Sequence, residues 1–386
     1  MKSEEINDRS KKMIVLDVHL NNFYSFKNFH MNLTYPKKIV DSTIKDEYLP
    51  NRPNFRYKKV NIFLGANATG KTTFGKIIMK IFNFIENKNF EIITDAIADR
   101  NKKASFVLDL ASNTYDLYRI KCEVNPCQDE KYTTDDIKVQ ILTEKIGMRD
   151  SYNSCIKRIS NIKFVPAENY ILELEKVGEL AWLFDYPDEE KLLLELPNNS
   201  VAFCKILENV LRSLDPSIKG VRILKSVDGA YVLKVHNRAI VLQSGVEIKT
   251  NILSSGTKSG IAISLMLYSL MQGLNSFYYC DEKFSYIQSD MEKAILSLMI
   301  DFIGPYDQLF FTTHNTDILD MNLPKHSFTF LRKNINNDEC PISCIDASSL
   351  LKRSTDSLRN AVENDLFSTA PSVELIYSIA DFFAKE

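Results

Sequence analysis

Long hydrophobic runs are missing from this sequence of 386 residues. The longest largely apolar stretch, Ile261 to Met271, has 11 residues, whereas a membrane-spanning helix needs about 20. Residues 1–15 also lack the apolar segment of a secretory signal. We therefore expect a cytoplasmic protein without a membrane partner, in which Ile261 to Met271 forms a buried helix.

A surplus of charge is missing too. Lysine and arginine total 48 against 50 acidic residues, which gives a net charge of -2 and no general attraction to nucleic acid. Any contact with DNA would need a local basic face. One small cluster (Arg52, Arg56, Lys58 and Lys59) is either such a contact or an ordinary solvated loop.

Paired cysteine motifs are absent. The seven cysteines are an odd number, and none of them forms a C-x-x-C pair of the kind that binds zinc. Cys340 and Cys344 are four residues apart, which is a weak metal signal compared with two ordinary thiols. We predict reduced cysteines and no disulfide framework.

Glycine is scarce, with 12 residues in the whole chain, or about 3% against a usual 7%. Its placement is therefore informative. Gly65 and Gly70 belong to one short motif, while Gly256 and Gly260 belong to another. This is expected where the backbone must approach a phosphate and a Cβ would not fit.

The first motif is a phosphate-binding loop. Residues 65–72 read GANATGKT and match G-x-x-x-x-G-K-[ST], between a predicted strand at Val60 to Leu64 and a predicted helix at Thr72 to Phe84. Backbone N–H groups would cradle the phosphates, Lys71 would neutralise the β and γ oxygens, and Thr72 would ligate Mg²⁺. The nucleotide-binding residues predicted here are Gly65, Asn67, Ala68, Thr69, Gly70, Lys71, Thr72 and Thr73.

Two carboxylates end a second predicted strand, Phe277 to Asp281, in the form of a Walker B motif. Asp281 would hold Mg²⁺, and Glu282 would orient and polarise the attacking water. The alternative is a strand that ends in a solvated acidic turn.

A histidine follows the next predicted strand. Ser289 to Ile303 reads as a helix and Gln308 to Thr312 as a strand that ends at His314. Ligands of open parallel sheets bind at the carboxyl ends of strands, so we expect His314 and Glu282 to converge on the γ-phosphate. We assign Lys71, Glu282 and His314 to catalysis.

The motifs GANATGKT, LSSGT (253–257), YYCDE (278–282) and TTHN (312–315), in this order, resemble those of ABC-type ATPases. The opening segment from Leu16 to Asn28 resembles the first strand of the RecF, SMC and OLD-like group. This resemblance implies ATP and Mg²⁺ as cofactors and a homodimer or higher oligomer, in which Ser254 and Gly256 contact the nucleotide of the partner. Ser255 and Thr257 depart from the usual LSGGQ signature.

The implied fold class is α/β: an ABC/RecF-type P-loop ATPase head with a mainly parallel core sheet, an antiparallel β subdomain and a helical insertion. We divide the chain into an N-terminal lobe (1–165), a helical or mixed insertion (166–250) and a C-terminal lobe (251–386). Ala104 to Leu110 and Tyr115 to Val124 read as paired strands. No sustained heptads and no Toprim acidic cluster are present, so we expect neither a coiled-coil arm nor a fused nuclease.

By this resemblance the chain looks like the ATPases of bacterial antiphage defence systems of the PARIS or RloA type. These imply a molecular switch that gates a separately encoded, nuclease-like effector, with DNA or a phage-derived protein as its trigger. The alternative is a RecF-like, DNA-binding ATPase of DNA repair. A transporter ATPase and a P-loop kinase are further alternatives, which the opening segment and the LSSGT motif disfavour.

Overall fold

The protein is described here from a computed structural model, which covers residues 12–40, 42–127, 131–186, 195–246, 253–334, 337–353, 355–368 and 376–379. Most of the N-terminal segment examined for a secretory signal lies outside these ranges. Within them, no helix combines the length and the apolar character that crossing a membrane requires. All seven cysteines are free, as predicted.

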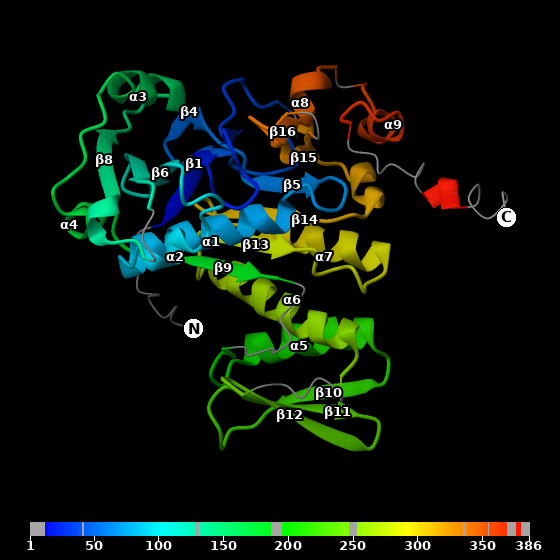
Figure 1. Cartoon of the computed structure of the whole chain (residues 1–386). Coiled ribbons are helices and arrows are strands. Elements are labelled where there is room, and N and C mark those ends of the chain that lie inside the picture. The colour runs from blue at the N-terminus through cyan, green and yellow to red at the C-terminus, as the bar shows by residue number, and fades with distance from the viewer. Residues whose placement is uncertain are drawn as a thin grey trace.

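A six-stranded sheet forms the centre of the molecule (Figure 1). Its strands, in spatial order, are β16 (Ile342–Asp346), β15 (Phe328–Lys333), β5 (Val60–Leu64), β14 (Gln308–Thr312), β13 (Phe277–Asp281) and β9 (Trp182–Asp185). Every neighbouring pair is parallel except β15 and β16. The predicted mainly parallel core is therefore confirmed. The three central strands β5, β14 and β13 are buried along their whole length, as their continuous apolar runs predict.

A second, antiparallel sheet covers one side of the core. Its order is β2 (Phe29–Asn32), β1 (Met13–Asn21), β6 (Ala104–Ser112), β7 (Asp116–Val124) and β8 (Ile137–Lys145). The predicted strand pair is thus β6 and β7. Helix α1 (Lys71–Asn87) lies between the two sheets, and its apolar residues join side chains of both sheets in one hydrophobic cluster (Figure 1).

Two helices pack on the opposite face of the core sheet, α6 (Ser255–Gln272) and α7 (Ser289–Phe302). Helix α5 (Val201–Leu214) packs against α6 and carries the antiparallel sheet of β10 (Ile218–Ile223), β11 (Ala230–Val235) and β12 (Arg238–Gln243). The range 166–250, expected as a helical or mixed insertion, therefore contains a β-sheet. It also contributes β9 to the edge of the core sheet.

Shorter elements complete the described chain. They are β3 (Tyr48–Leu49), β4 (Arg52–Arg56), α2 (Glu91–Thr94), α3 (Tyr152–Ile159), α4 (Tyr170–Leu174), α8 (Ala347–Leu350), α9 (Leu358–Glu363) and the 3-10 helices η1 (Thr134–Asp136), η2 (Thr316–Asp320) and η3 (Lys325–Ser327).

Two of the four residues of the small basic cluster near β5 do not belong to a solvated loop, whereas Arg52 and Arg56 are partly exposed. Lys58 and Lys59 are buried, with exposures of 3% and 2%. Lys58 pairs with Asp346, and the Lys59 ammonium donates to the Lys45 carbonyl at 2.9 Å. Burial lowers the pKa of Lys59. The two lysines therefore tie β5 to neighbouring segments of the chain.

Candidate functional site

The loop between β5 and α1 has the backbone form of a phosphate cradle. Gly65 has a φ of 153°, and a Cβ there would lie 2.6 Å from the Leu331 carbonyl oxygen. Gly70 has a φ of 100°, and its Cβ would meet Ile342 at 3.0 Å and Phe26 at 3.3 Å. Both positions therefore require glycine. The N-cap residue of α1 is Gly70, which has no side chain to cap the first N–H groups of the helix, so these groups can bind an anion.

Lys71 is folded into this loop. Its side chain is 4% exposed, and its ammonium donates to the Gly65 carbonyl at 2.9 Å and to the Ala66 carbonyl at 3.3 Å. The same nitrogen lies 3.4 Å from Oε1 of Glu282. Burial lowers the pKa of Lys71, while the nearby Glu282 carboxylate raises it. The lysine thus bridges the loop and the end of β13.

Thr72 and Asp281 meet directly. The Thr72 hydroxyl donates to Oδ2 of Asp281 at 2.5 Å, and the Thr312 hydroxyl donates to Oδ1 at 2.6 Å. Burial raises the pKa of Asp281, and the two hydroxyl bonds lower it. A hydroxyl and a carboxylate oxygen at this separation are the hard oxygen ligands that Mg²⁺ prefers. These residues therefore fit the predicted magnesium site.

Glu282 and His314 also come together. Nε2 of His314 lies 2.8 Å from Oε1 of Glu282, and both side chains are partly open to solvent. Glu282 has a φ of 45°, an uncommon left-handed conformation that turns the chain sharply after β13. The hydrogen bond from His314 lowers the pKa of Glu282. Burial raises this pKa, and the charge of Lys71 lowers it further. The carboxylate is therefore held ionised, as a general base must be.

A partly buried hydrogen-bond network supports the segment that carries His314. The Thr313 hydroxyl donates to Oε1 of Glu292 at 2.7 Å, and the Asn315 amide donates to Oε2 at 2.7 Å. Asn315 also donates to Ser289, whose hydroxyl in turn donates to Asp317 at 2.7 Å. These bonds fix the turn after β14 against the start of α7.

Sequence reasoning missed two supporting residues, Thr312 and Tyr279. The register of β13 and β14 places Thr312 opposite Asp281, so its position at the end of the adjacent strand was a usable signal. The Tyr279 hydroxyl donates to the Lys71 carbonyl at 2.6 Å. No sequence signal marks this tyrosine, because its role depends on how α1 packs against β13.

The LSSGT residues lie at the start of α6. The Ser254 hydroxyl accepts a hydrogen bond from the Thr257 N–H at 3.1 Å and caps the helix. A Cβ at Gly256 would lie 3.6 Å from the Tyr286 carbonyl oxygen. Among the described residues, the hydrogen bonds of Ser254 stay within its own helix start and do not reach the phosphate loop. Its contact with nucleotide remains a prediction.

A hollow of about 390 Å³ lies beside the segment between β1 and β2. It is lined by Asn22, Tyr24, Phe26, Lys27, Lys102 and Pro341, among others. Phe26 is also the ring that packs against Gly70. Phe26 thus connects the hollow to the beginning of α1, and the lining combines aromatic, amide and cationic groups with the carboxylate of Asp99.

Comparison with known proteins gives similarity to solved structures alone. No family model and no curated protein matches the chain. An SMC head bound to the C-terminal winged-helix domain of ScpA is 14% identical, with 88% of this chain and 99% of that chain covered and a TM-score of 0.49. An SMC head with an extended coiled coil, bound to a ScpA domain from Pyrococcus furiosus, is 13% identical, with 88% and 98% covered and a TM-score of 0.48. The recombination mediator RecF with ATPrS is 11% identical, with 86% and 98% covered and a TM-score of 0.44.

Proposed function

We propose that this protein binds Mg²⁺ and ATP and hydrolyses ATP to ADP and phosphate. The observation that carries this proposal is the convergence of Lys71, Glu282 and His314 at one edge of the core sheet. Nζ of Lys71 lies 3.4 Å and Nε2 of His314 lies 2.8 Å from the same carboxylate oxygen. A cation beside a carboxylate suits hydrolysis of a phosphoanhydride, which needs charge neutralisation and an oriented water.

Each side chain has a distinct part. The α1 N–H groups and Lys71 would hold the β- and γ-phosphates, and Lys71 would exchange its loop carbonyls for phosphate oxygens. Thr72 and Asp281 would hold Mg²⁺, which supplies neutralisation of phosphate charge when bound. Glu282 would accept a hydrogen bond from the attacking water. His314 would orient that carboxylate and stabilise charge near the γ-phosphate.

We propose that the nucleoside binds in the hollow lined by Tyr24 and Phe26. Phe26 lines this hollow and lies 3.3 Å from the Cβ position of Gly70, and the partly exposed ring of Tyr24 offers stacking to a purine. A base in this position would leave the phosphates at the start of α1.

The wider role is inferred from the motifs. We propose that ATP joins two copies head to tail, with Ser254 and Gly256 of one copy closing the phosphate loop of the other. We further propose that this closure makes the protein a sensor in antiphage defence, in which it gates a separately encoded, nuclease-like effector after contact with DNA or a phage protein. The motif order GANATGKT, LSSGT, YYCDE and TTHN supports the head-to-tail dimer, and the defence role rests on the resemblance to antiphage ATPases alone.

Two measurements on the purified full chain test the ATPase activity and the gating of an effector separately. ATP turnover should require Mg²⁺ and stop with EDTA; an absence of both nucleotide binding and turnover would contradict the ATPase proposal. Mass analysis of proteins that co-purify when the chain is expressed with its native flanking genes should find a stoichiometric nuclease-like companion. A chain that purifies alone under every nucleotide condition contradicts the gating role only.

A RecF-like, DNA-binding ATPase is the second candidate, and one surface favours it. Arg222, Lys234 and Arg238 line a hollow of about 650 Å³ on the β10–β12 sheet, and none of the described residues in its lining is acidic. A cationic hollow of this kind suits a phosphate backbone. If this role is correct, DNA binding depends on ATP and weakens steeply with salt, and Arg222→Gln with Arg238→Gln reduces the salt slope.

A further inference from the structure

A cluster of two histidines and one aspartate lies on the outer face of the antiparallel sheet and shares no residue with the proposed nucleotide site. Asp17 and His19 are two residues apart on β1, so they share a face of the sheet. The β1–β2 register places His19 opposite His30 and Asp17 opposite Asn32. A shift of register between Val15 and Asp17 in the β1–β6 pairing accompanies this placement.

The three side chains point at one another. Oδ1 of Asp17 lies 2.7 Å from Nε2 of His19, and Oδ2 lies 3.0 Å from Nε2 of His30. The two imidazole rings stack with centroids 3.9 Å apart and an interplanar angle of 8°. Both rings therefore present Nε2 to the same carboxylate, and the three possible ligand atoms lie within 4.8 Å of one another.

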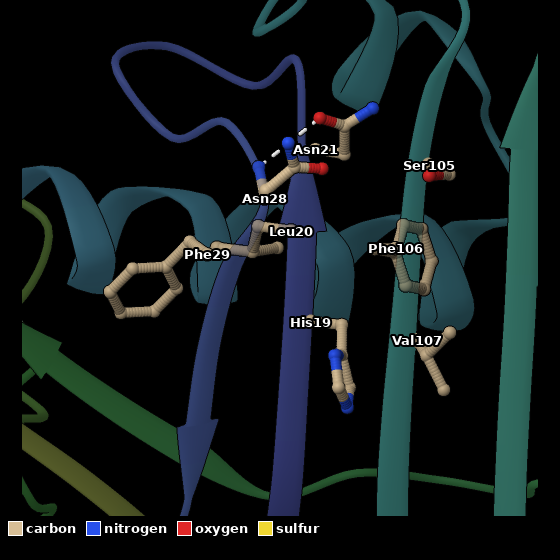
Figure 2. Close-up of a pocket in the computed structure, with 8 residues that line it drawn as sticks. All are labelled: His19, Leu20, Asn21, Asn28, Phe29, Ser105, Phe106 and Val107. Atoms are coloured by element: carbon tan, nitrogen blue, oxygen red, sulfur yellow. Dashed lines mark hydrogen bonds between the residues drawn. The ribbon is translucent and has the colours of Figure 1, made fainter. Parts of the chain in front are cut away.

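The aspartate of the cluster is buried, whereas both histidines are open to solvent. The Asp17 side chain is 4% exposed, whereas those of His19 and His30 are 46% and 49% exposed. The cluster thus has a fixed, buried carboxylate and an open side that water can reach. His19 also lines a hollow of about 320 Å³ on this face (Figure 2). Three protein ligands with one open position are the usual form of a zinc site that exchanges its fourth ligand.

A supporting contact holds the carboxylate in place. The Asn32 amide donates to Oδ2 of Asp17 at 2.8 Å, which orients a carboxylate that is already buried. Outer contacts of this kind tune the ligands of protein metal sites. The Cys344 thiol donates to the His30 backbone carbonyl at 3.0 Å and therefore pins the strand that carries His30.

We propose that Asp17, His19 and His30 bind one divalent first-row transition-metal ion, such as Zn²⁺. Metal–ligand bonds of about 2.0 to 2.2 Å place neighbouring ligand atoms of a tetrahedral site about 3.3 to 3.6 Å apart, so the two present contacts need to open by less than about 1 Å. Each imidazole would carry its proton on Nδ1 and offer the Nε2 lone pair. Mg²⁺ and Ca²⁺ do not suit this set, because they select oxygen ligands.

The metal would join β1 to β2, the strand at the edge of the sheet. The loop between these strands carries Phe26, which packs against Gly70. The ion would thus stabilise the hairpin that borders the phosphate loop. This inference does not depend on the proposed ATPase function, because none of its three ligands belongs to the nucleotide site.

The test is Zn²⁺ binding by the full chain without nucleotide, followed by calorimetry and by metal analysis after dialysis. The wild type should retain one equivalent, and Zn²⁺ should raise its melting temperature. His19→Gln and His30→Gln should each weaken binding at least about tenfold. Both histidines are partly exposed, so these variants should fold, which circular dichroism checks.

Three controls separate this site from others. His236→Asn changes an exposed histidine in the β11–β12 turn, with a φ of 48° that asparagine tolerates, and should bind Zn²⁺ like the wild type. Asp281→Asn removes the predicted Mg²⁺ ligand and should also leave Zn²⁺ binding unchanged. Co²⁺ bound to the wild type should show no thiolate charge-transfer absorption, because no ligand is a cysteine. Wild-type affinity in both histidine variants, a thiolate band, or no retained metal would each overturn the proposal.

Discussion

Glu282 and His314 meet across the ends of two adjacent parallel strands, with 2.8 Å between Oε1 and Nε2. Glu282 directly follows β13, and His314 lies two residues after β14. The register pairs Asp281 with Thr312, so the carboxyl ends of the strands stop at the same edge. Their meeting follows from this register, since the two residues are 32 positions apart in the sequence.

Glu282→Gln should retain ATP binding and hydrolyse ATP at least about 100-fold more slowly, because the amide cannot accept a proton from water. Steady-state phosphate release and equilibrium binding of ATP measure the two effects. Glu175→Gln, the same change at an exposed position at the end of α4, should hydrolyse ATP at the wild-type rate. A normal rate in Glu282→Gln would remove the general-base assignment.

The acid limb of the rate against pH should depend on His314. The hydrogen bond from His314, with Lys71, lowers the pKa of Glu282, so the carboxylate stays ionised at a lower pH than an ordinary glutamate. His314→Ala removes the largest cause of this lowering, and its acid limb should move to higher pH. The stability that this contact contributes is present above the ordinary glutamate range and is lost as the pH falls through the lowered pKa. An unchanged acid limb would contradict the role of His314.

Lys71→Met should reduce kcat/KM for ATP by at least about 100-fold, because it removes the cation that we propose to neutralise the phosphates. Lys76→Met is the matched control, since Lys76 lies on the same helix and is exposed. The control should leave kcat/KM near the wild-type value. Equal losses in both variants would indicate damage to α1 in place of a phosphate contact.

Gly256 allows a test of the proposed dimer that spares the fold. A Cβ at Gly256 meets its nearest atom at 3.6 Å, an ordinary contact, so Gly256→Ala should leave the melting temperature unchanged. We expect Glu282→Gln alone to form an ATP-dependent dimer, and Gly256→Trp combined with Glu282→Gln should still bind ATP but should fail to form it. Light scattering with and without ATP measures this difference. Persistence of the dimer in the double variant would show that the helix start is not at the interface.

Gly75 should be intolerant of a single added methyl group. A Cβ at this position would lie 2.5 Å from the ring of Tyr279, whose side chain is fully buried. Gly75→Ala should therefore lower the free energy of unfolding by about 1 to 3 kcal/mol, although alanine is the better helix former. Denaturant unfolding measures this change. Gly220→Ala, where the added Cβ meets nothing within 4 Å, should not destabilise the protein by more than about 0.5 kcal/mol.

The elements next to the phosphate loop could be predicted closely, because short continuous apolar runs specify buried strands. Val60–Leu64 and Gln308–Thr312 are observed with the predicted bounds, and the predicted helix at Thr72 to Phe84 is α1. The secondary structure of residues 166–250 was harder to predict. Its helical patches gave no sign that β10–β12 would form a sheet against α5, since amphipathic segments of this length suit either state until a partner is present.

The basic cluster near β5 shows why charge in the sequence did not predict a surface. Lys58 and Lys59 looked like part of an exposed patch, yet both are buried because Asp346 and the Lys45 carbonyl satisfy their ammonium groups. Partners so distant in the sequence leave no local pattern.

The sequence by itself determined the phosphate loop and the strand-end carboxylates, because G-x-x-x-x-G-K-[ST] and an apolar strand with two acids are local patterns whose chemistry depends on adjacent residues. Only the tertiary structure decided which side chains meet. The parallel register places Thr312 against Asp281, the packing of α1 puts Tyr279 beneath Lys71, and the β1–β2 pairing sets His19 against His30. These contacts join distant residues, and only the packing of sheets and helices brings them within bonding distance.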